Sequence, residues 1–255
     1  VVIGTFFSIA IVKQLYGGLG FNMFNPAMVG YVVLLISFPI SMSAWLPVQS
    51  MAQTPYDFLD ALNVIATGYS QTGYSLAQLQ LGVDSVTQAT PLDAVRTGLL
   101  GGMTYSETLS APIFISDWGW SYGWSAVSIA YLIGGVFLLQ QRIINWHMPI
   151  SMLFGVIVTA GLLNMLAPDQ TGSIPFHLFS GAVIFGAFFI VTDPVSGSTT
   201  DKGRLIFGAL IGFLTVIIRT YGGYPDAIAF AVIIMNIAVP LIDYYTQPRA
   251  YGHQP

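Results

Sequence analysis

Long apolar stretches that contain no charged residue alternate along the chain with polar segments. Seven such stretches can be read, at residues 1–12, 26–42, 124–140, 148–167, 174–192, 205–218 and 227–242. A helix needs about 20 apolar residues, or about 17 at the short end, to cross the hydrocarbon core of a bilayer. Residues 124–140, 148–167 and 174–192 meet that length. The pattern therefore predicts an all-α, polytopic membrane protein.

The first apolar stretch is too short for a complete span, and the chain opens inside it without an initiator Met or a basic lead. A signal peptide is the competing interpretation. No Ala-x-Ala-like cleavage site follows, however, and Lys13 lies at the wrong end of the stretch. We therefore expect that N-terminal spans upstream of residue 1 are missing.

Lys and Arg are distributed unevenly between the two sides that alternating spans create. One side has Lys13, Arg142, Lys202, Arg204 and Arg249, whereas the other has Arg96 and Arg219. The positive-inside rule makes the first side cytoplasmic, in a bacterial inner membrane. We expect a transmembrane region at 1–42, an extracytoplasmic segment at 43–122, five spans in 123–243 and a cytoplasmic tail at 244–255.

Two of the shorter stretches follow irregular, proline-containing sequence. Residues 17–26 lead into 26–42, and residues 192–198 lead into 205–218. Interrupted helices in corresponding halves are typical of inverted-repeat transporters, and irregular backbone at that depth must be buried or line a cavity. We predict such a plan, with residues 24–27 and 192–196 close together near the bilayer midplane. The alternative is two ordinary cytoplasmic loops followed by slightly short helices.

The extracytoplasmic segment contains two helix starts of the form Thr-Pro-x-Asp, at residues 54–57 and 90–93. Thr is a good N-cap, Pro fits the first helical position, and an acid in the first turn complements the helix dipole. The two starts differ in what precedes them. Thr90 closes the heptapeptide Asp84-Ser85-Val86-Thr87-Gln88-Ala89-Thr90, whereas nothing comparable precedes Thr54.

That heptapeptide resembles the Asp-x-x-Ser/Thr-Gly-Ala-Thr signature at which a flavin transferase attaches FMN to threonine through a phosphoester bond. Gln88 stands where the signature usually has Gly. Phe24-Asn25-Pro26-Ala27, Pro91-Leu92-Asp93 and Thr192-Asp193-Pro194-Val195-Ser196 extend the likeness. Over essentially its whole length the chain resembles the family that comprises the RnfD proteins of Rnf-type electron transport complexes and the NqrB proteins of sodium-translocating NADH:quinone oxidoreductases.

The resemblance implies a site and a function. Thr90 would carry covalent FMN, and Asp84, Thr87 and Ala89 would belong to the transferase's recognition sequence. The protein would be one subunit of a translocase, a ferredoxin- or NADH-linked complex that couples electron transfer to Na⁺ or H⁺ movement. Its partners would be other membrane, flavin or iron–sulfur subunits, the flavin transferase and the lipid bilayer. The resemblance leaves open a second, noncovalent flavin.

Arg96 is the one cation of this segment, six residues after Thr90, and is a candidate contact for the flavin phosphate. The alternative is an i,i+3 ion pair with Asp93 on an exposed helix, worth a few tenths of a kcal/mol.

Composition and the remaining polar residues argue against several other classes of protein and kinds of site. The chain is 55% hydrophobic and 7% charged, far below the roughly 25% charged residues of a soluble domain. A net charge of −4 argues against a nucleic-acid binder, and the lack of Cys excludes Cys-ligated clusters and thiol catalysis. His147, His177 and His253 are too scattered to predict a metal site, and no self-contained catalytic site is visible.

Two alternatives remain open. Asp193 and Asp226 lie at helix starts, where they serve first as caps or dipole partners. If cations pass through the protein, Asn25, Thr192 and Ser196 would have to coordinate them.

The broken-helix plan also resembles that of urea transporters. A channel or transporter for a small solute is therefore the second functional hypothesis, and fold alone does not decide between it and the electron-transfer subunit.

Overall fold

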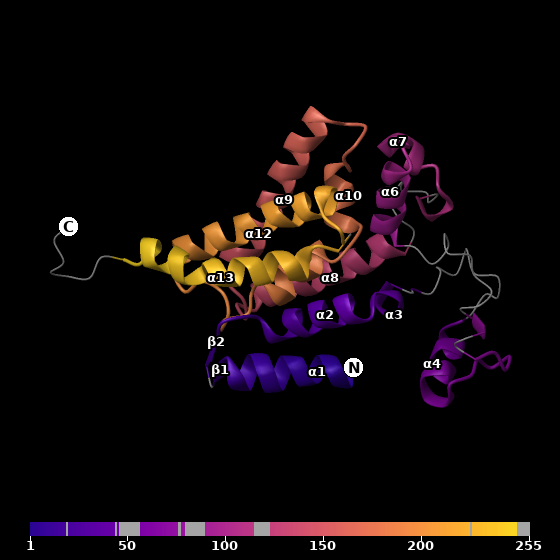
Figure 1. The fold of residues 1–255 in the computed structure, drawn as a ribbon, viewed down its shortest axis with the longest axis horizontal. Helices are drawn as coiled ribbons and strands as arrows, with labels where there is room; N and C mark the ends of the chain where they lie inside the picture. Colours follow the sequence, from indigo (N-terminus) through magenta and orange to yellow (C-terminus); the bar gives the residue numbers. More distant parts are fainter. Residues whose placement is uncertain are drawn as a thin grey trace.

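The computed structural model describes residues 1–18, 20–43, 45, 57–75, 78–79, 90–114, 123–224 and 226–248. Its architecture is helical (Figure 1), and the described strands are only β1 (Gly17–Gly18) and β2 (Phe21–Asn22), which pair antiparallel. The all-α prediction is confirmed. The flavin-signature residues Asp84, Thr87 and Ala89, together with Thr54, Arg249 and His253, lie outside the described residues.

Four long apolar helices form the centre of the structure: α8 (Trp124–Gln140), α9 (His147–Leu166), α12 (Asp201–Tyr221) and α13 (Ile228–Thr246). Of these, α9, α12 and α13 are long and apolar enough to cross a membrane. The prediction of a short span at 205–218 is wrong, because α12 has 21 residues. Thr200 is the N-cap of α12, and its Oγ1 accepts a hydrogen bond from Gly203 N at 3.0 Å. The charged residues that follow Thr200 therefore form the first turn of α12.

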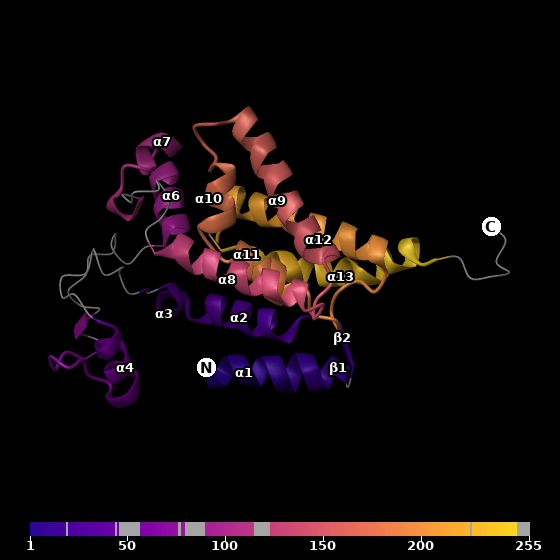
Figure 2. The ribbon, with the colours of Figure 1, turned by 180° about the vertical axis from the view of Figure 1, so that it is seen from behind.

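Other predicted spans are interrupted. Residues 1–12 fall in α1 (Val2–Phe6) and the π-helix η1 (Phe7–Leu15), which lie beside α2 (Figure 2). Residues 26–42 divide into α2 (Pro26–Ser37) and α3 (Pro39–Ser43), with the break at Phe38, because a residue before proline disfavours helical backbone.

The single span predicted at 174–192 is wrong as a continuous helix. It consists of α10 (Ile174–Phe179), α11 (Val183–Phe185) and the π-helix η4 (Gly186–Ile190), with a break at residues 180–182. Gly181 lies in this break, where a Cβ would lie 2.6 Å from Arg219 Nη2 and 2.7 Å from a methyl carbon of Leu92, so the packing there leaves no room for a side chain.

Short helices make up the described part of the segment between residues 43 and 122. They are α4 (Phe58–Thr67), α6 (Pro91–Leu100), α7 (Tyr105–Thr108) and the 3-10 helix η3 (Pro112–Phe114). The predicted start of α6 at Thr90 is confirmed. The start predicted at Thr54 lies outside the described residues, and α4 itself begins after Asp57, which is its N-cap and forms a capping box with Asp60.

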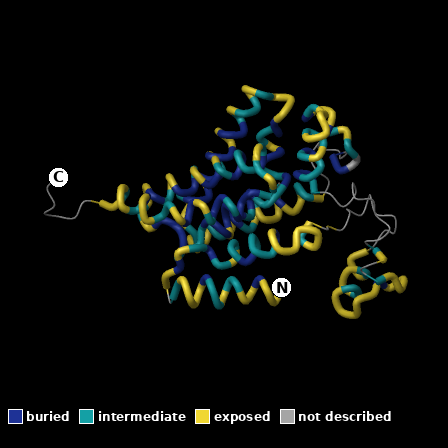
Figure 3. The backbone as a smooth tube through the Cα atoms, in the orientation of Figure 1, coloured by how far each residue is buried: buried dark blue, intermediate teal, exposed yellow. Residues whose placement is uncertain are grey.

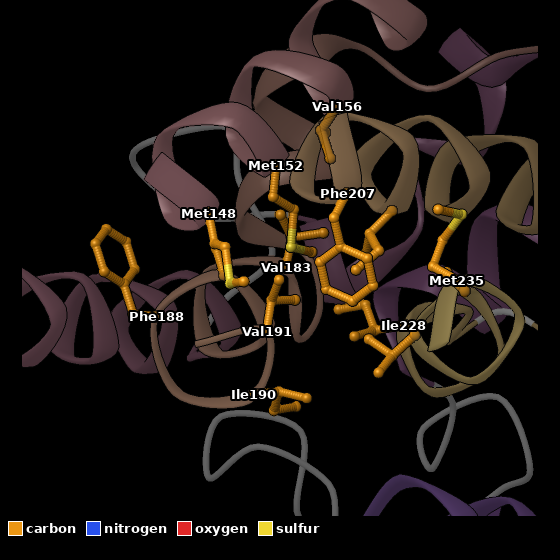
Figure 4. Packing of buried hydrophobic residues seen from close by; sticks show 14 of the residues in the cluster. Met148, Met152, Val156, Val183, Phe188, Ile190, Val191, Phe207, Ile228 and Met235 are labelled. Atoms are coloured by element: carbon orange, nitrogen blue, oxygen red, sulfur yellow. The ribbon is translucent and has the colours of Figure 1, made fainter. Parts of the chain in front are cut away.

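A single large core joins the long helices to the broken one (Figure 3). Met152 and Val156 of α9 lie beside Phe207 of α12, Val183 of α11 and Ile228 of α13 (Figure 4), and all are almost completely buried. Large apolar side chains also remain exposed on the outer faces of these helices, among them Phe137, Phe154, Leu162, Ile237 and Leu241. Such broad exposed apolar faces fit a lipid environment.

Small residues bring α9 and α12 into close contact. Gly208 and Gly212 of α12 face Ser151 and Gly155 of α9, and a Cβ at Gly155 would collide with the Ala209 carbonyl oxygen. A Cβ at Gly212 would likewise collide with the Met152 carbonyl oxygen. Spacings of the small-xxx-small type permit this approach of two helix backbones in membranes.

We expect Gly155→Ala to lower the free energy of unfolding by about 1–3 kcal/mol, because the new methyl group overpacks a backbone contact. Gly161→Ala is the matched control in the same helix, since its Cβ would make an ordinary 3.5 Å contact with Ile174. Thermal unfolding in detergent, followed by circular dichroism, compares the two variants. Equal stability of both would contradict the close α9–α12 packing.

Candidate functional site

Thr90 begins α6 and is held by its own capping box. Its hydroxyl donates to Asp93 Oδ2 at 2.7 Å, and Asp93 N donates back to Thr90 Oγ1 at 3.2 Å. The Thr90 N–H lies 3.4 Å from the same carboxylate oxygen. The strongest bond in this box is therefore the one that joins the hydroxyl to the carboxylate.

A second threonine capping box, at α7, differs in its shortest bond. At α7, Glu107 Oε2 accepts from the Thr104 backbone N–H at 2.7 Å, and the Thr104 hydroxyl instead lies 3.1 Å from Ser106 Oγ. Bonds from the Thr104 N–H and, to a smaller extent, from the Thr104 side chain lower the pKa of Glu107. The two threonines thus cap their helices in the same way, and the short 2.7 Å bond from hydroxyl to carboxylate is a feature of Thr90.

Thr90 lines a cavity of about 440 Å³, hereafter the Thr90 cavity. Aromatic side chains from α2, α8, α11 and neighbouring segments surround it: Tyr31, Trp45, Trp124, Tyr131, Phe185 and Tyr224. The Trp45 and Trp124 rings meet edge to face with centroids 5.2 Å apart. This volume lies within the roughly 300–1,000 Å³ of small-molecule sites, and an aromatic lining with few polar groups is typical of them.

Carboxylates supply much of the polar lining of the Thr90 cavity. Asp93 and Asp226 both contribute to it, and Asp226 Oδ1 is buried with no hydrogen-bond partner among the described residues. Burial raises the pKa of Asp226, an effect that the positive charge of Arg219 partly offsets. The predicted role of Asp226 near a helix start fits its position directly before α13.

Arg96 lies on the other side of α6. It lines a separate cavity of about 450 Å³, the Arg96 cavity, which includes His177 and Arg219 but not Thr90. The alternative pairing of Arg96 with Asp93 is not seen, because the ion pair found among the described residues joins Arg204 to Asp201. Contact between Arg96 and a flavin phosphate stays a prediction.

The two proline-containing leads meet, as predicted. Asn25 Nδ2 donates to Asp193 Oδ2 at 3.5 Å, and Ser196 Oγ donates to the same oxygen at 2.6 Å. Asn236 of α13 joins them, since its Oδ1 accepts from Asn25 N at 3.0 Å and its Nδ2 donates to the Ser196 carbonyl at 2.9 Å. The depth of this polar cluster in the bilayer stays a prediction.

The structure also defines the surroundings of the other predicted polar residues. Thr192 donates its hydroxyl to the Phe188 carbonyl at 2.8 Å, and Asp193 caps the following turn through Val195 N at 3.2 Å. In the described part of the chain, no group of three or more His, Asp or Glu side chains is placed to hold a metal ion.

Comparison with known proteins places the chain in a family. Residues 1–252 match the NQR2, RnfD, RnfE family. The chain belongs to that family. The family resemblance expected from residues 84–90 and the two proline-containing leads is confirmed.

Relatives of this NQR2, RnfD, RnfE family member are similar over nearly all of the chain. The protein of Aliivibrio salmonicida is 55% identical over 253 residues, which cover 99% of this chain and 72% of the relative. That of Aeromonas hydrophila is 55% identical, covering 98% and 71%, and that of Vibrio cholerae is 54% identical, covering 99% and 72%. Each is named as the D subunit of an ion-translocating oxidoreductase complex.

Sequence reasoning missed two residues of this family member that matter structurally. Asn236, only 1% exposed, holds the two leads together, and Arg219, 7% exposed, donates to the His177 carbonyl at 2.7 Å. One signal could have revealed Asn236: an amide inside an apolar span needs a buried partner. Arg219 lies in the last turn of α12, where its charge suits the helix dipole, so its contact with the broken helix was not evident from sequence.

We expect Asn236→Ala to lower the free energy of unfolding by at least about 2 kcal/mol, because it leaves the Asn25 N–H and the Ser196 carbonyl buried without a partner. Asn164→Ala is the control, since Asn164 makes one long bond, 3.5 Å from Nδ2 to the Thr171 carbonyl. Thermal unfolding of both variants in detergent measures the difference. Equal stability of the two variants would show that Asn236 does not hold the leads together.

Proposed function

We propose that this chain is the D subunit of an ion-translocating oxidoreductase complex and that it carries FMN on Thr90 through a phosphoester bond. Family membership and the names of its relatives support the first part. The observation that carries the second is that Thr90, at the end of its signature heptapeptide, lines an aromatic cavity of ligand size.

The residues of the Thr90 cavity fit a flavin. Flat aromatic side chains offer stacking surfaces for an isoalloxazine ring, and the unpartnered Asp226 Oδ1 is an acceptor for a ring N–H. The first turn of α6 offers backbone N–H groups and the positive end of the helix dipole to a phosphate. When bound, the flavin would supply the redox chemistry, while the protein holds and orients it.

Attachment at Thr90 and the present bond from its hydroxyl to Asp93 exclude each other. An ester at Thr90 Oγ1 has no proton to donate, so Asp93 Oδ2 loses the 2.7 Å bond that it now accepts. The phosphate also brings negative charge beside the Asp93 carboxylate, which disfavours the present contact. Asp93 would therefore leave the Thr90 oxygen, and the N–H groups at the start of α6 would become available to the phosphate.

The proposal extends to coupling and partners. Electrons would pass between flavin or iron–sulfur subunits of the complex, coupled to Na⁺ or H⁺ movement, after a flavin transferase has modified Thr90. The Asn25–Asp193–Asn236 cluster, which we predict to lie near the bilayer midplane, would respond to such coupling. A solute channel, the second hypothesis, finds no support in the names of the relatives.

We expect Thr90→Ala to abolish covalent flavin, because no other atom at this position can form the ester. Thr104→Ala is the matched control, since Thr104 is also the N-cap of a capping box in the same segment. Either change removes a cap worth about 0.5–2 kcal/mol, so stability alone does not separate them. In-gel flavin fluorescence of the denatured proteins separates the two variants. A fluorescent Thr90→Ala band would refute the linkage.

The distribution of Lys and Arg supports an extracytoplasmic position of Thr90, in the inner membrane. Because the chain has no Cys, we expect Gln71→Cys to react with an impermeant maleimide from outside intact spheroplasts, and Gln141→Cys to react only after permeabilisation. Both positions are exposed, so burial does not bias the comparison. Labelling in the opposite pattern would reverse the topology and place the flavin on the cytoplasmic side.

A further inference from the structure

Arg219 lies directly behind one wall of the Thr90 cavity. Gly181 lines that cavity, and a Cβ at Gly181 would lie 2.6 Å from Arg219 Nη2. Any residue larger than glycine at position 181 would therefore collide with the guanidinium. Because Gly181 has no side chain, the charge of Arg219 comes close to the Thr90 cavity although Arg219 itself lines only the Arg96 cavity.

The Arg219 guanidinium is buried and incompletely paired. The residue is 7% exposed, and its Nη1 donates to the His177 carbonyl at 2.7 Å. Its Nε and Nη2 are buried without a hydrogen-bond partner among the described residues, so they reach no cavity surface and influence a ligand through charge rather than contact. Arginine stays protonated in proteins, and a buried charge is screened much less than one in water.

Asp226 supplies the opposite charge. It directly precedes α13, lines the Thr90 cavity, and its Oδ1 is buried without a partner among the described residues. Burial raises the pKa of Asp226, and the positive charge of Arg219 partly offsets that rise. The ion pair found in the described part of the chain is a different one, between Arg204 and Asp201. Arg219 and Asp226 therefore act on each other electrostatically without direct contact.

A structural role accounts for only part of Arg219. A cation in the last turn of α12 suits the helix dipole, and the bond to the His177 carbonyl supports the broken helix. A neutral amide could donate the same bond without the larger cost of burying a charge. What the charge adds is a positive potential at the wall of the Thr90 cavity.

The lining of the Thr90 cavity is otherwise acidic. Asp93 and Asp226 both line it, and none of its described lining residues is Lys or Arg. Two carboxylates in a buried site disfavour any further negative charge there, because Coulomb interactions strengthen where water is excluded. A cation behind the wall opposes that effect, so Arg219 and Asp226 have opposite influences on an electron that enters the cavity.

We propose that Arg219 raises the reduction potential of the flavin in the Thr90 cavity and that Asp226 lowers it. This inference rests on the proposed flavin at Thr90. A one-electron reduction adds one negative charge to the isoalloxazine when no proton accompanies the electron. A nearby cation therefore favours the reduced form and a nearby carboxylate the oxidised form, as charges beside a redox cofactor do in general.

The test is a redox titration of the purified intact complex, with dithionite as the reductant and mediator dyes present. In-gel flavin fluorescence first establishes that each variant carries covalent flavin on this subunit. Arg219→Gln removes the charge and keeps an N–H donor for the His177 carbonyl. It should change the one-electron equilibrium at least tenfold toward the oxidised form, which lowers the midpoint potential of the covalent flavin by about 59 mV.

Two further variants give the sign and the control. Asp226→Asn should raise the midpoint potential, because it removes a negative charge from the cavity lining. Arg142→Gln, at an exposed turn residue, loses the same charge as Arg219→Gln and should leave the potential unchanged. If Arg219→Gln has the potential of the parent, or if Arg142→Gln shifts it equally, the proposal is wrong.

Arg219→Lys separates charge from structure. Lysine keeps the positive charge but lacks the planar guanidinium. Its potential should lie closer to that of the parent than the potential of Arg219→Gln does. An equal fall in both variants would assign Arg219 a structural role and overturn the proposal. If Arg219→Gln does not fold, Asp226→Asn decides, since an unchanged potential in that variant contradicts the proposal.

A second measurement needs no flavin. In complex purified from cells that lack the flavin transferase, thermal unfolding of Arg219→Gln, Asp226→Asn and the double variant forms a double-mutant cycle. Because the two charges attract, the double variant should lose less stability than the two single losses together. Additive losses would overturn the electrostatic link between them. A parent without covalent flavin would refute the linkage at Thr90, whereas bound flavin with unshifted potentials refutes this inference alone.

Discussion

Every backbone polar group at membrane depth must find a partner within the protein, and this chain breaks its helices repeatedly. Side chains from neighbouring helices satisfy the backbone groups freed at these breaks. Ser128 Oγ donates to the Phe179 carbonyl at 2.9 Å, Arg219 Nη1 to the His177 carbonyl at 2.7 Å, and Asn236 Nδ2 to the Ser196 carbonyl at 2.9 Å. The interruptions at residues 180–182 and 192–198 are therefore built into the packing, and polar side chains of the long helices support both.

The cavities follow from these breaks. Where α10 ends and α11 begins, residues 180–182 line the Thr90 cavity, and His177 on the preceding turn lines the Arg96 cavity. The glycine-mediated contact of α9 with α12 fixes the helix that carries Arg219. The broken helix formed by α10, α11 and η4 therefore contributes to both the Thr90 cavity and the Arg96 cavity. A change at residues 180–182 would affect both cavities.

The chemistry of Thr90 lies in its surroundings rather than in its role as a cap. Thr104 caps α7 with the same kind of box, and its hydroxyl lies 3.1 Å from Ser106 Oγ, but Thr104 does not line the Thr90 cavity. Thr90 combines a hydroxyl, a neighbouring carboxylate and an aromatic cavity. Local sequence makes the cap, and long-range packing of α2, α8 and α11 makes the surroundings.

The sequence by itself determined the class of protein, the helices at 124–140 and 148–167 and the cap at Thr90. These depend on apolar run length and on local cap chemistry, which act over a few residues. The meeting of residues 24–27 with 192–196 was predicted instead from the repeated proline-containing pattern. Only the tertiary structure decided that residues 174–192 are broken, that Asn236 joins the two leads, and that Arg96 and Thr90 line different cavities. Those outcomes depend on partners distant in sequence, because a freed carbonyl or a buried guanidinium is satisfied by whichever side chain the packing brings to it.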